Sequence, residues 1–183
     1  MSDMVRDVLD LPSTLRVSFS FGAVSVGNAS FKAVVTALEA DKIKIVVNPK
    51  LGANTAIYSW KKNRFTFGFS TAAGNADRES LVVHEAVHAG FDAAGSPMGV
   101  KQSEAAAYIA QCLYYYYRNE TEFAGGKSPS FGDPILKAAW PVSQIVLIRP
   151  ALTDADVAPL LDAIAKHPLY KSRADKSDEF DGV

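Results

Sequence analysis

The chain has 183 residues, of which 48% are hydrophobic and 21% are charged, and its formal net charge is -1. This size and composition predict a folded globular protein with a sizeable core, and so small a net charge gives no electrostatic basis for binding nucleic acid or an anionic membrane. The longest apolar and aromatic stretch, at 105–117, falls short of the roughly 20 residues that a bilayer span needs. We therefore expect neither a nucleic-acid partner nor a membrane span.

The N-terminal segment and the cysteine content bear on the compartment. The segment MSDMVRDVLDLPST has no basic stretch followed by an apolar core, so it does not resemble a cleavable secretory signal. Cys112 is the single cysteine, which rules out an internal disulfide. Both features predict a cytoplasmic protein and leave export without a cleaved signal open. Neither feature indicates the oligomeric state.

The first 70 residues contain mostly strand patterns. Alternating apolar and small polar residues predict a strand over 15–26, and a helix with apolar residues at helical spacing is predicted over 29–41. Another strand is predicted over 42–49. The aromatic-rich segments 55–60 and 65–70 are joined by the polar sequence KKNR, which predicts a β-hairpin.

From residue 77 the pattern changes to helical. One helix is predicted over 77–94, with Asp77 as its cap, and a second over 102–118. The long polar loop that follows, residues 119–133, is of the kind that often forms a lid or a binding loop. Residues 134–149 fit either a short helix or a buried strand.

The C-terminal part contains one more helix and a charged tail. The sequence TDAD at 153–156 is typical of a capping box and predicts a helix that runs to Lys166. The tail at 171–183 has no apolar periodicity and is predicted to fray. Because no linker divides the chain, we expect an α+β fold in a single domain, residues 1–170, followed by this tail.

Two of the three histidines lie four positions apart inside the predicted 77–94 helix. His84, Glu85 and His88 form the pattern H-E-x-x-H. Residues four apart lie one helical turn above each other, so both imidazoles can reach one metal ion, and the carboxylate of Glu85, about 100° around the helix, can reach a water on that ion. The pattern therefore predicts a zinc site with Glu85 as general base. The alternative is two neutral histidines packed in the core.

A catalytic zinc site usually has three protein ligands and one open position, so the pair requires a third ligand. The pattern with a further histidine six residues on is absent, because Ala94 stands there. Asp92 would lie about 12 Å along the helix axis from His84 and is expected to orient an imidazole or to be a solvated acid at the helix end. His167 ends a distant helix, where a cation is favourable.

Glu104 is the remaining candidate for the third ligand. It lies in the first turn of the next predicted helix, after a break that suits an antiparallel return, so its carboxylate can approach the histidines across the helix interface. Three alanines follow it and keep the helix surface small at that point, and Tyr108 and Gln111 share its face. These residues favour Glu104 as a ligand. The other interpretation is an acid that stabilises a helix N-terminus.

With these residues the sequence resembles the gluzincins, zincin-like metallopeptidases in which H-E-x-x-H on one helix is completed by a glutamate on a following helix. The resemblance covers residues 80–111 by motif and 42–111 by order of elements. It is most similar to minimal bacterial gluzincins with a second motif E-x-x-A. The resemblance implies a zincin-like α+β fold, with a small mixed or antiparallel sheet packed on an active-site helix and a following glutamate helix, and a Zn2+ ion held by His84, His88 and Glu104.

The resemblance also implies that Glu85 is the catalytic base. It further implies that the strand before the active-site helix, residues 65–70, is a sheet edge along which an extended peptide pairs. The aspartate found three residues after the glutamate in longer forms of the second motif is replaced by Ala107. Tyr108, one turn after Glu104, is our candidate for the group that stabilises the oxyanion, and packing in the core is its competing interpretation.

The leading predicted function is hydrolysis of an amide bond in a peptide or protein substrate by a zinc-activated water. The alternative is a zincin-like protein that binds a metal or a partner without hydrolysis, which a closed site with Asp92 or His167 in place of water would favour. A third possibility is a toxin or effector protease with one narrow target. The sequence does not indicate the substrate.

Overall fold

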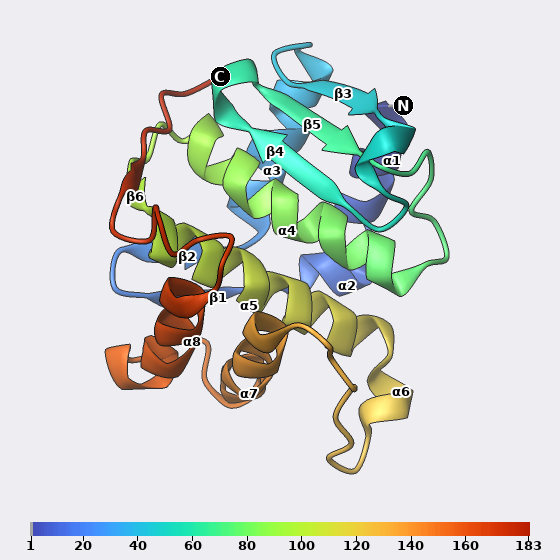
Figure 1. Ribbon diagram of the computed structural model, residues 1–183. Helices are drawn as coiled ribbons and strands as arrows, with labels where there is room; N and C mark the ends of the chain where they lie inside the picture. The colour runs from blue at the N-terminus through green and yellow to red at the C-terminus, as the bar shows by residue number, and fades with distance from the viewer. Residues whose placement is uncertain (1) are drawn as a thin grey trace.

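A computed structural model describes residues 2–183, and its architecture is α+β, as the sequence predicts (Figure 1). The described elements, in chain order, are α1 Ser2–Leu9, α2 Pro12–Leu15, β1 Phe19–Phe21, β2 Val24–Val26, α3 Asn28–Glu39, β3 Lys44–Val47, η1 Pro49–Leu51, β4 Ala56–Ser59, η2 Trp60–Lys62, β5 Arg64–Phe67, α4 Ala76–Ala93, β6 Met98–Gly99, α5 Val100–Arg118, α6 Glu120–Phe123, α7 Pro134–Ile148, α8 Asp154–Lys166 and β7 Ser177–Asp178.

The main sheet has three strands in the order β3-β5-β4. The predicted hairpin is confirmed, because β4 and β5 pair antiparallel, and β3 pairs parallel with β5, so the sheet is mixed. Alternate residues of β5 point into the core, where Phe65 and Phe67 are fully buried and their rings stack on each other. One face of the sheet is therefore apolar and packs on a helix.

The predicted single strand over 15–26 is wrong, because that segment turns back on itself. Residues 12–15 form α2, and the remainder is a short hairpin in which Phe21 pairs with Val24. Gly22 supplies the turn with a φ of 52°, a left-handed conformation that a residue without Cβ adopts at little cost. The alternating apolar pattern continues through this turn and therefore does not reveal it.

The predicted helices are present with shifted ends. The first helix residue of α4 is Ala76, and its cap is the side chain of Asn75, which accepts from the backbone N–H of Arg78, rather than the predicted Asp77. The ambiguous segment 134–149 is the helix α7, and the capping box of α8 between Thr153 and Asp156 is formed. The predicted loop over 119–133 contains the single-turn helix α6.

The helix α4 lies at the centre of the fold, between the sheet and α5 (Figure 1). The two helices run antiparallel, with α7 and α8 packed on the far side of α5. Small residues allow both α5 and α3 to pack closely on α4. The three alanines that follow Glu104 are fully buried, and at Gly90 an added Cβ would come within 3.2 Å of the Ser30 side chain on α3. The core thus surrounds α4.

The predicted frayed tail is instead folded back onto the body of the protein. We define the C-terminal segment as residues 167–183. Within it, Tyr170 and Phe180 are buried, Phe180 packs against Phe91, and β7 pairs with β6. The backbone N–H of Val100 also donates to the carbonyl of Lys176. The sequence pattern does not reveal this fold-back, because the few aromatic residues of the segment are buried by long-range contacts, which leave no apolar periodicity.

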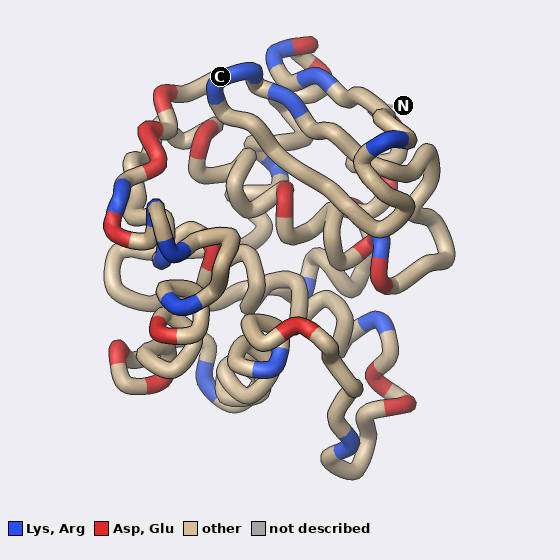
Figure 2. Tube along the Cα trace, in the orientation of Figure 1, with Lys and Arg blue, Asp and Glu red and all other residues tan. Residues whose placement is uncertain are grey.

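The outer surface carries mixed charge. Lys and Arg positions and Asp and Glu positions are both spread over the chain trace, in keeping with the net charge of -1 (Figure 2). Of the helices that the structure describes, none combines the length and the apolar character that crossing a bilayer requires.

A buried carboxylate joins the start of α4 to the end of α5. Glu79 is 2% exposed and accepts hydrogen bonds from the Tyr114 hydroxyl at 2.8 Å, from the Arg118 Nε–H at 2.9 Å and from the Gly74 backbone N–H at 2.8 Å. Three donors compensate the cost of burying the charge. This contact fixes the end of the α4–α5 pair that lies away from the C-terminal segment.

We expect Glu79→Ala to lower the free energy of unfolding by about 2–4 kcal/mol, because it leaves the Tyr114 hydroxyl buried without an acceptor and Arg118 without its counter-charge. Urea unfolding followed by circular dichroism measures this. The matched control is Glu122→Ala in the exposed helix α6, which should change the stability by no more than about 0.5 kcal/mol. Equal effects of the two substitutions would contradict the anchoring role of Glu79.

Candidate metal centre

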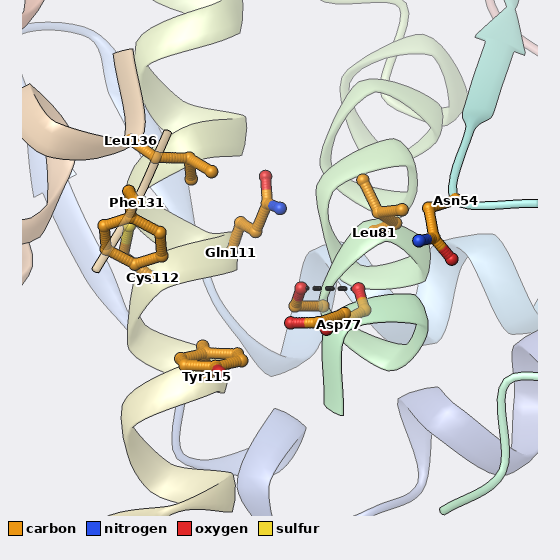
Figure 3. A pocket seen from close by; sticks show the side chains of 9 residues that line it. Asn54, Asp77, Leu81, Gln111, Cys112, Tyr115, Phe131 and Leu136 are labelled. Carbon is orange, nitrogen blue, oxygen red and sulfur yellow. Dashed lines mark hydrogen bonds between the residues drawn. The ribbon is translucent and has the colours of Figure 1, made fainter. Parts of the chain in front are cut away.

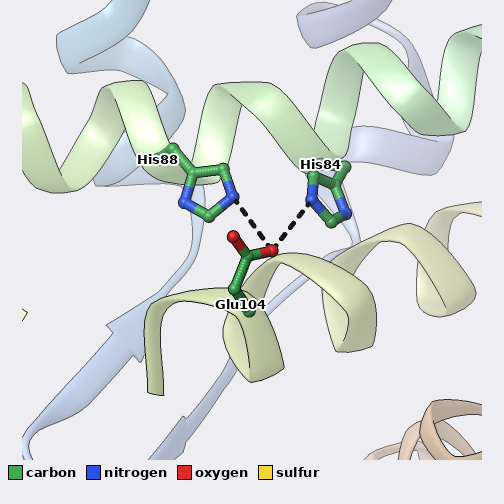
Figure 4. A group of neighbouring side chains, drawn as sticks. All are labelled: His84, His88 and Glu104. Atoms are coloured by element: carbon green, nitrogen blue, oxygen red, sulfur yellow. Dashed lines mark ion pairs between the residues drawn. The ribbon is translucent and has the colours of Figure 1, made fainter. Parts of the chain in front are cut away.

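Two histidines and one glutamate meet between α4 and α5. His84 and His88 project from α4 and Glu104 from α5 (Figure 4). Each offers one ligand atom, and these atoms all lie within 4.8 Å of one another in the interior of the fold. The Nε2 atoms of both imidazoles lie 3.7 Å from the same Glu104 oxygen, Oε2. The predicted three residues therefore form a buried group that could hold a metal ion.

The spacing of the motif explains the arrangement. Because His84 and His88 are four residues apart on one helix, their rings lie next to each other on the same face of α4, with centroids 5.2 Å apart and planes inclined at 67°. The antiparallel return of α5 brings Glu104 opposite this face. The buried alanines next to Glu104 let the two helix backbones approach, so its short side chain reaches the space between the rings.

Hydrogen bonds behind the rings orient the two imidazoles. His84 Nδ1 lies 3.0 Å from the Gln111 Oε1, and His88 Nδ1 lies 2.8 Å from the Ser103 Oγ, both on α5. An amide oxygen only accepts, so this contact places a proton on His84 Nδ1 and turns the Nε2 atom towards Glu104. This is the arrangement that metal-binding histidines usually have.

The Glu104 carboxylate is ionised at neutral pH and incompletely satisfied. Burial opposes its ionisation, but the adjacent His88 and His84 outweigh burial and lower the pKa of the Glu104 carboxyl to about 2. Its Oε2 atom is buried and has no hydrogen-bond partner. A buried anionic oxygen without a donor is costly, so this position favours a cation.

The two histidines differ in their protonation. Burial lowers the pKa of the His88 imidazole to about 4, so this ring is neutral at pH 7. Burial also disfavours the charged form of His84, but the adjacent Glu104 carboxylate and the negative charge of Glu85 raise the pKa of His84 overall. The group therefore combines an ionised carboxylate, a neutral imidazole and a second imidazole in an anionic environment. With His84 in its neutral form, this donor set suits a divalent cation, which would take the place of the proton.

Glu85 faces a different neighbour. Its buried carboxylate accepts a hydrogen bond of 2.6 Å from the backbone N–H of Tyr58 on β4. Burial raises the pKa of the Glu85 carboxyl, although the charge of His84 and the Tyr58 N–H both oppose this. Glu85 thus lies beside the ligand group without belonging to it, in agreement with its predicted place on the helix.

The strand next to the group is β4, which corrects the expected sheet edge. The sequence predicts residues 65–70 as the edge, but β5 is the central strand, with β3 on one side and β4 on the other. The order differs because β3 adds in parallel to the far side of β5, and such non-local pairing leaves no local signal. The strand edge closest to Glu85 is therefore β4.

Asp92 neither orients an imidazole nor lies in solvent, so both expectations for it are wrong. It is fully buried and accepts a hydrogen bond of 2.5 Å from the Tyr58 hydroxyl. The backbone N–H groups of Asp181 and Gly182 lie close enough to favour its charged form, although burial dominates and raises the pKa of Asp92. Asp92 thus ties α4 to β4 and to the C-terminal segment.

His167 and Tyr108 occupy different places. His167 lies just beyond the end of α8, where its Nδ1 accepts from the Leu169 N–H, and it does not join the ligand group.

Tyr108 is close to the group. Its ring packs edge-on against His84, with centroids 4.6 Å apart, and its hydroxyl lies 3.3 Å from that of Tyr170. Its predicted catalytic role stays a prediction.

The C-terminal segment supplies two neighbours of the group that the sequence does not reveal. An Arg173 Nη2 atom lies 3.4 Å from Glu104 Oε1, the carboxylate oxygen that does not contact the histidines. Negative charge at Glu104 also contributes to the raised pKa of Tyr170, after burial. Arg173 thus holds one carboxylate oxygen and leaves the other directed at the imidazoles. Both residues come from a segment without apolar periodicity, in which the aromatic residues Tyr170 and Phe180 are the local hints of burial.

Comparisons of this chain with protein-family models, with curated proteins and with solved structures find no match.

We expect Arg173→Ala to weaken the affinity for Zn2+ about tenfold, because groups that orient a metal ligand typically contribute 10–100-fold to affinity. Arg173→Lys should lose less, since it keeps the positive charge beside Glu104. Competition with a chromophoric chelator measures the affinity. Arg149→Ala is the control, because Arg149 pairs with Asp156 on the surface. Tighter zinc binding by Arg173→Ala would instead mean that the guanidinium competes with the ion for Glu104.

Proposed function

We propose that the protein is a zinc-dependent peptidase of the gluzincin type. The observation that carries this proposal is the buried Glu104 oxygen, which has no hydrogen-bond donor and lies equidistant from the Nε2 atoms of two histidines in an H-E-x-x-H motif. The order of strand edge, motif helix and antiparallel glutamate helix supports the zincin-like interpretation of the α+β fold. Two imidazoles and one carboxylate are a common ligand set of catalytic zinc.

In this proposal His84, His88 and Glu104 hold the ion. Bound zinc would polarise the substrate carbonyl and lower the pKa of a water ligand towards neutrality. The protein residues around it maintain the ligands in their required states. Gln111 and Ser103 keep both Nε2 atoms directed inwards, and Arg173 keeps the second oxygen of Glu104 turned away.

Glu85 is the proposed general base. Its carboxyl is buried, which raises its pKa above the ordinary value and makes the carboxylate a stronger proton acceptor. The Tyr58 N–H holds one oxygen of the carboxylate and leaves the other for the attacking water. Glu85 would take a proton from this water and pass it to the leaving amine.

The substrate is proposed to lie along β4. This strand has a partner on one side only, and in the register with β5 the backbone of Ile57 and Ser59 faces β5, whereas that of Tyr58 faces outwards towards Glu85. An extended peptide could pair with the outward-facing backbone groups of β4 other than the Tyr58 N–H, which Glu85 occupies, and bring its scissile bond past Glu85. Tyr108, whose ring packs on His84, is the proposed donor to the developing oxyanion.

We expect Glu85→Gln to retain zinc and to lose about 10²–10⁴-fold in turnover, the usual contribution of a positioned general base. The amide oxygen can still accept from Tyr58, so the fold and the ligands should be undisturbed. Turnover is best measured on a diverse peptide pool by mass spectrometry, because an enzyme with one narrow target would leave casein intact. Undiminished cleavage by a zinc-loaded Glu85→Gln protein would contradict the assigned role.

Protein purified without added zinc should contain close to one zinc ion per chain, by elemental mass spectrometry. His84→Ala and Glu104→Ala should each lose most of it, and a chelator should abolish both zinc content and cleavage. His167→Ala is the control, because His167 lies outside the ligand group. Full zinc content in Glu104→Ala would contradict the three-ligand assignment.

The non-catalytic alternative receives less support. A closed structural site needs a fourth protein ligand, and the two candidates for it, Asp92 and His167, contact other groups. Among residues 2–183 the group contains three potential ligands, which leaves one tetrahedral position for water or substrate. Metal binding with no cleavage of any peptide in the pool would favour the alternative.

A further inference from the structure

A cavity of about 240 Å³ opens between α4 and α5, next to the metal centre (Figure 3). Its walls come from the first turns of α4, from the second half of α5, from the segment that leads into α7 and the first turn of α7, and from Asn54 just before β4. The residues on which the argument rests are Asp77, Leu81, Gln111, Tyr115, Phe131 and Leu136. The volume is suited to a single amino-acid side chain rather than to a large cofactor.

Gln111 connects this cavity to the candidate metal centre. Its side-chain oxygen bonds to the His84 Nδ1, and the same side chain forms part of the cavity wall. Asp77 lies at the opposite end. It precedes His84 by seven residues on α4, which corresponds to about 10 Å along the helix axis. The cavity thus extends from the back of a metal-ligand candidate to a carboxylate two helical turns away.

The two ends of the cavity differ in chemistry. The apolar side chains of Leu81, Phe131 and Leu136 line it together with the ring of Tyr115. The Asp77 side chain points from α4 towards Tyr115 on α5, and it is exposed (Figure 3). Burial, and then the negative charge of Asp77, raise the pKa of the Tyr115 hydroxyl, in keeping with this proximity. A cavity with these apolar side chains in its wall, together with the polar Asn54 and Ser80, therefore ends at an anionic carboxylate and an aromatic ring.

We propose that this cavity binds the side chain of a lysine or arginine in the substrate, next to the scissile bond. That the bound side chain belongs to a substrate rests on the proposed peptidase function. The recognition of a cation follows from the cavity itself. A long aliphatic stem fits along Leu81, Phe131 and Leu136, as the stems of basic side chains commonly lie on apolar surfaces. Its charged end then meets the carboxylate of Asp77 and the face of Tyr115, two groups that attract cations.

Other side chains fit this cavity less well. A norleucine or leucine side chain would fill the apolar part and leave Asp77 without a partner. A phenylalanine side chain would place its ring against the walls but could not bond to the carboxylate. An acidic side chain would be repelled by Asp77. The distance from the metal centre to Asp77 thus selects for length, and the charge of Asp77 selects for a cation.

The test is direct binding of small ligands to the metal-free, full-length protein, in which no turnover consumes the ligand. The N-acetyl amides of arginine, lysine, norleucine and phenylalanine are titrated by isothermal calorimetry, with nuclear magnetic resonance to locate the perturbed residues. We expect the arginine and lysine amides to bind about tenfold more tightly than the norleucine amide. Resonances of Leu81 and Tyr115 should shift.

Substitution of Asp77 separates its two possible roles. Asp77→Asn should remove most of the advantage of the basic ligands and leave the affinity for the norleucine amide and the zinc content unchanged. The matched control is Asp154→Asn, an equivalent acid in the first turn of α8, which loses the same helix-end charge far from the cavity. This substitution should leave ligand binding as in the parent chain.

Either of two results would overturn the proposal: a norleucine or phenylalanine amide that binds as tightly as the arginine amide, or an advantage of arginine that persists in Asp77→Asn. Failure of the peptidase function has a different signature. In that case the basic amides still bind in an Asp77-dependent way, but the zinc-loaded protein cleaves no peptide, including those with lysine or arginine at every position.

Discussion

The close antiparallel packing of α4 on α5 is the constraint on which the candidate site depends. It buries one oxygen of Glu104 opposite two imidazoles and gives that oxygen no hydrogen-bond donor. A protein core rarely tolerates an unpaired anionic oxygen, because the cost of desolvation is not repaid. The neighbouring groups stabilise the charged carboxylate and keep His88 neutral. The result is a small volume with fixed donors, in which a cation would relieve the electrostatic cost.

Elements distant in sequence hold this geometry in place. The Tyr58 hydroxyl and backbone N–H connect β4 to Asp92 and Glu85 on α4, so one residue sets the distance between the strand edge and the motif helix. Arg173 reaches Glu104 from the C-terminal segment. Residues that contact a candidate ligand from behind fix its orientation, and such contacts matter for metal binding as well as the ligands do. The same segment that appears unstructured by composition therefore completes the surroundings of the site.

The groove between the two central helices has different chemistry at its two ends. At one end are the candidate ligands, and at the other a carboxylate and an aromatic ring. Gln111 belongs to both, since it orients His84 and lines the cavity. A change in the spacing of α4 and α5 would therefore alter the candidate ligand group and the cavity together. This coupling follows from building both on one helix pair instead of on separate loops.

The sequence alone determined those features that depend on residues close together in the chain. Helical spacing identified α4 and α5, the motif identified the histidine pair, and the aromatic hairpin was recognisable from its alternation and its polar turn. The choice of Glu104 also followed from sequence, because an antiparallel return after a short break leaves few alternatives. Only the tertiary structure decided which strand lies at the sheet edge. It also decided that Asp92 is buried and that residues 171–183 fold back onto the body of the protein. These features depend on pairing and burial between segments far apart in the chain, and such contacts leave no periodic trace in the segments that make them.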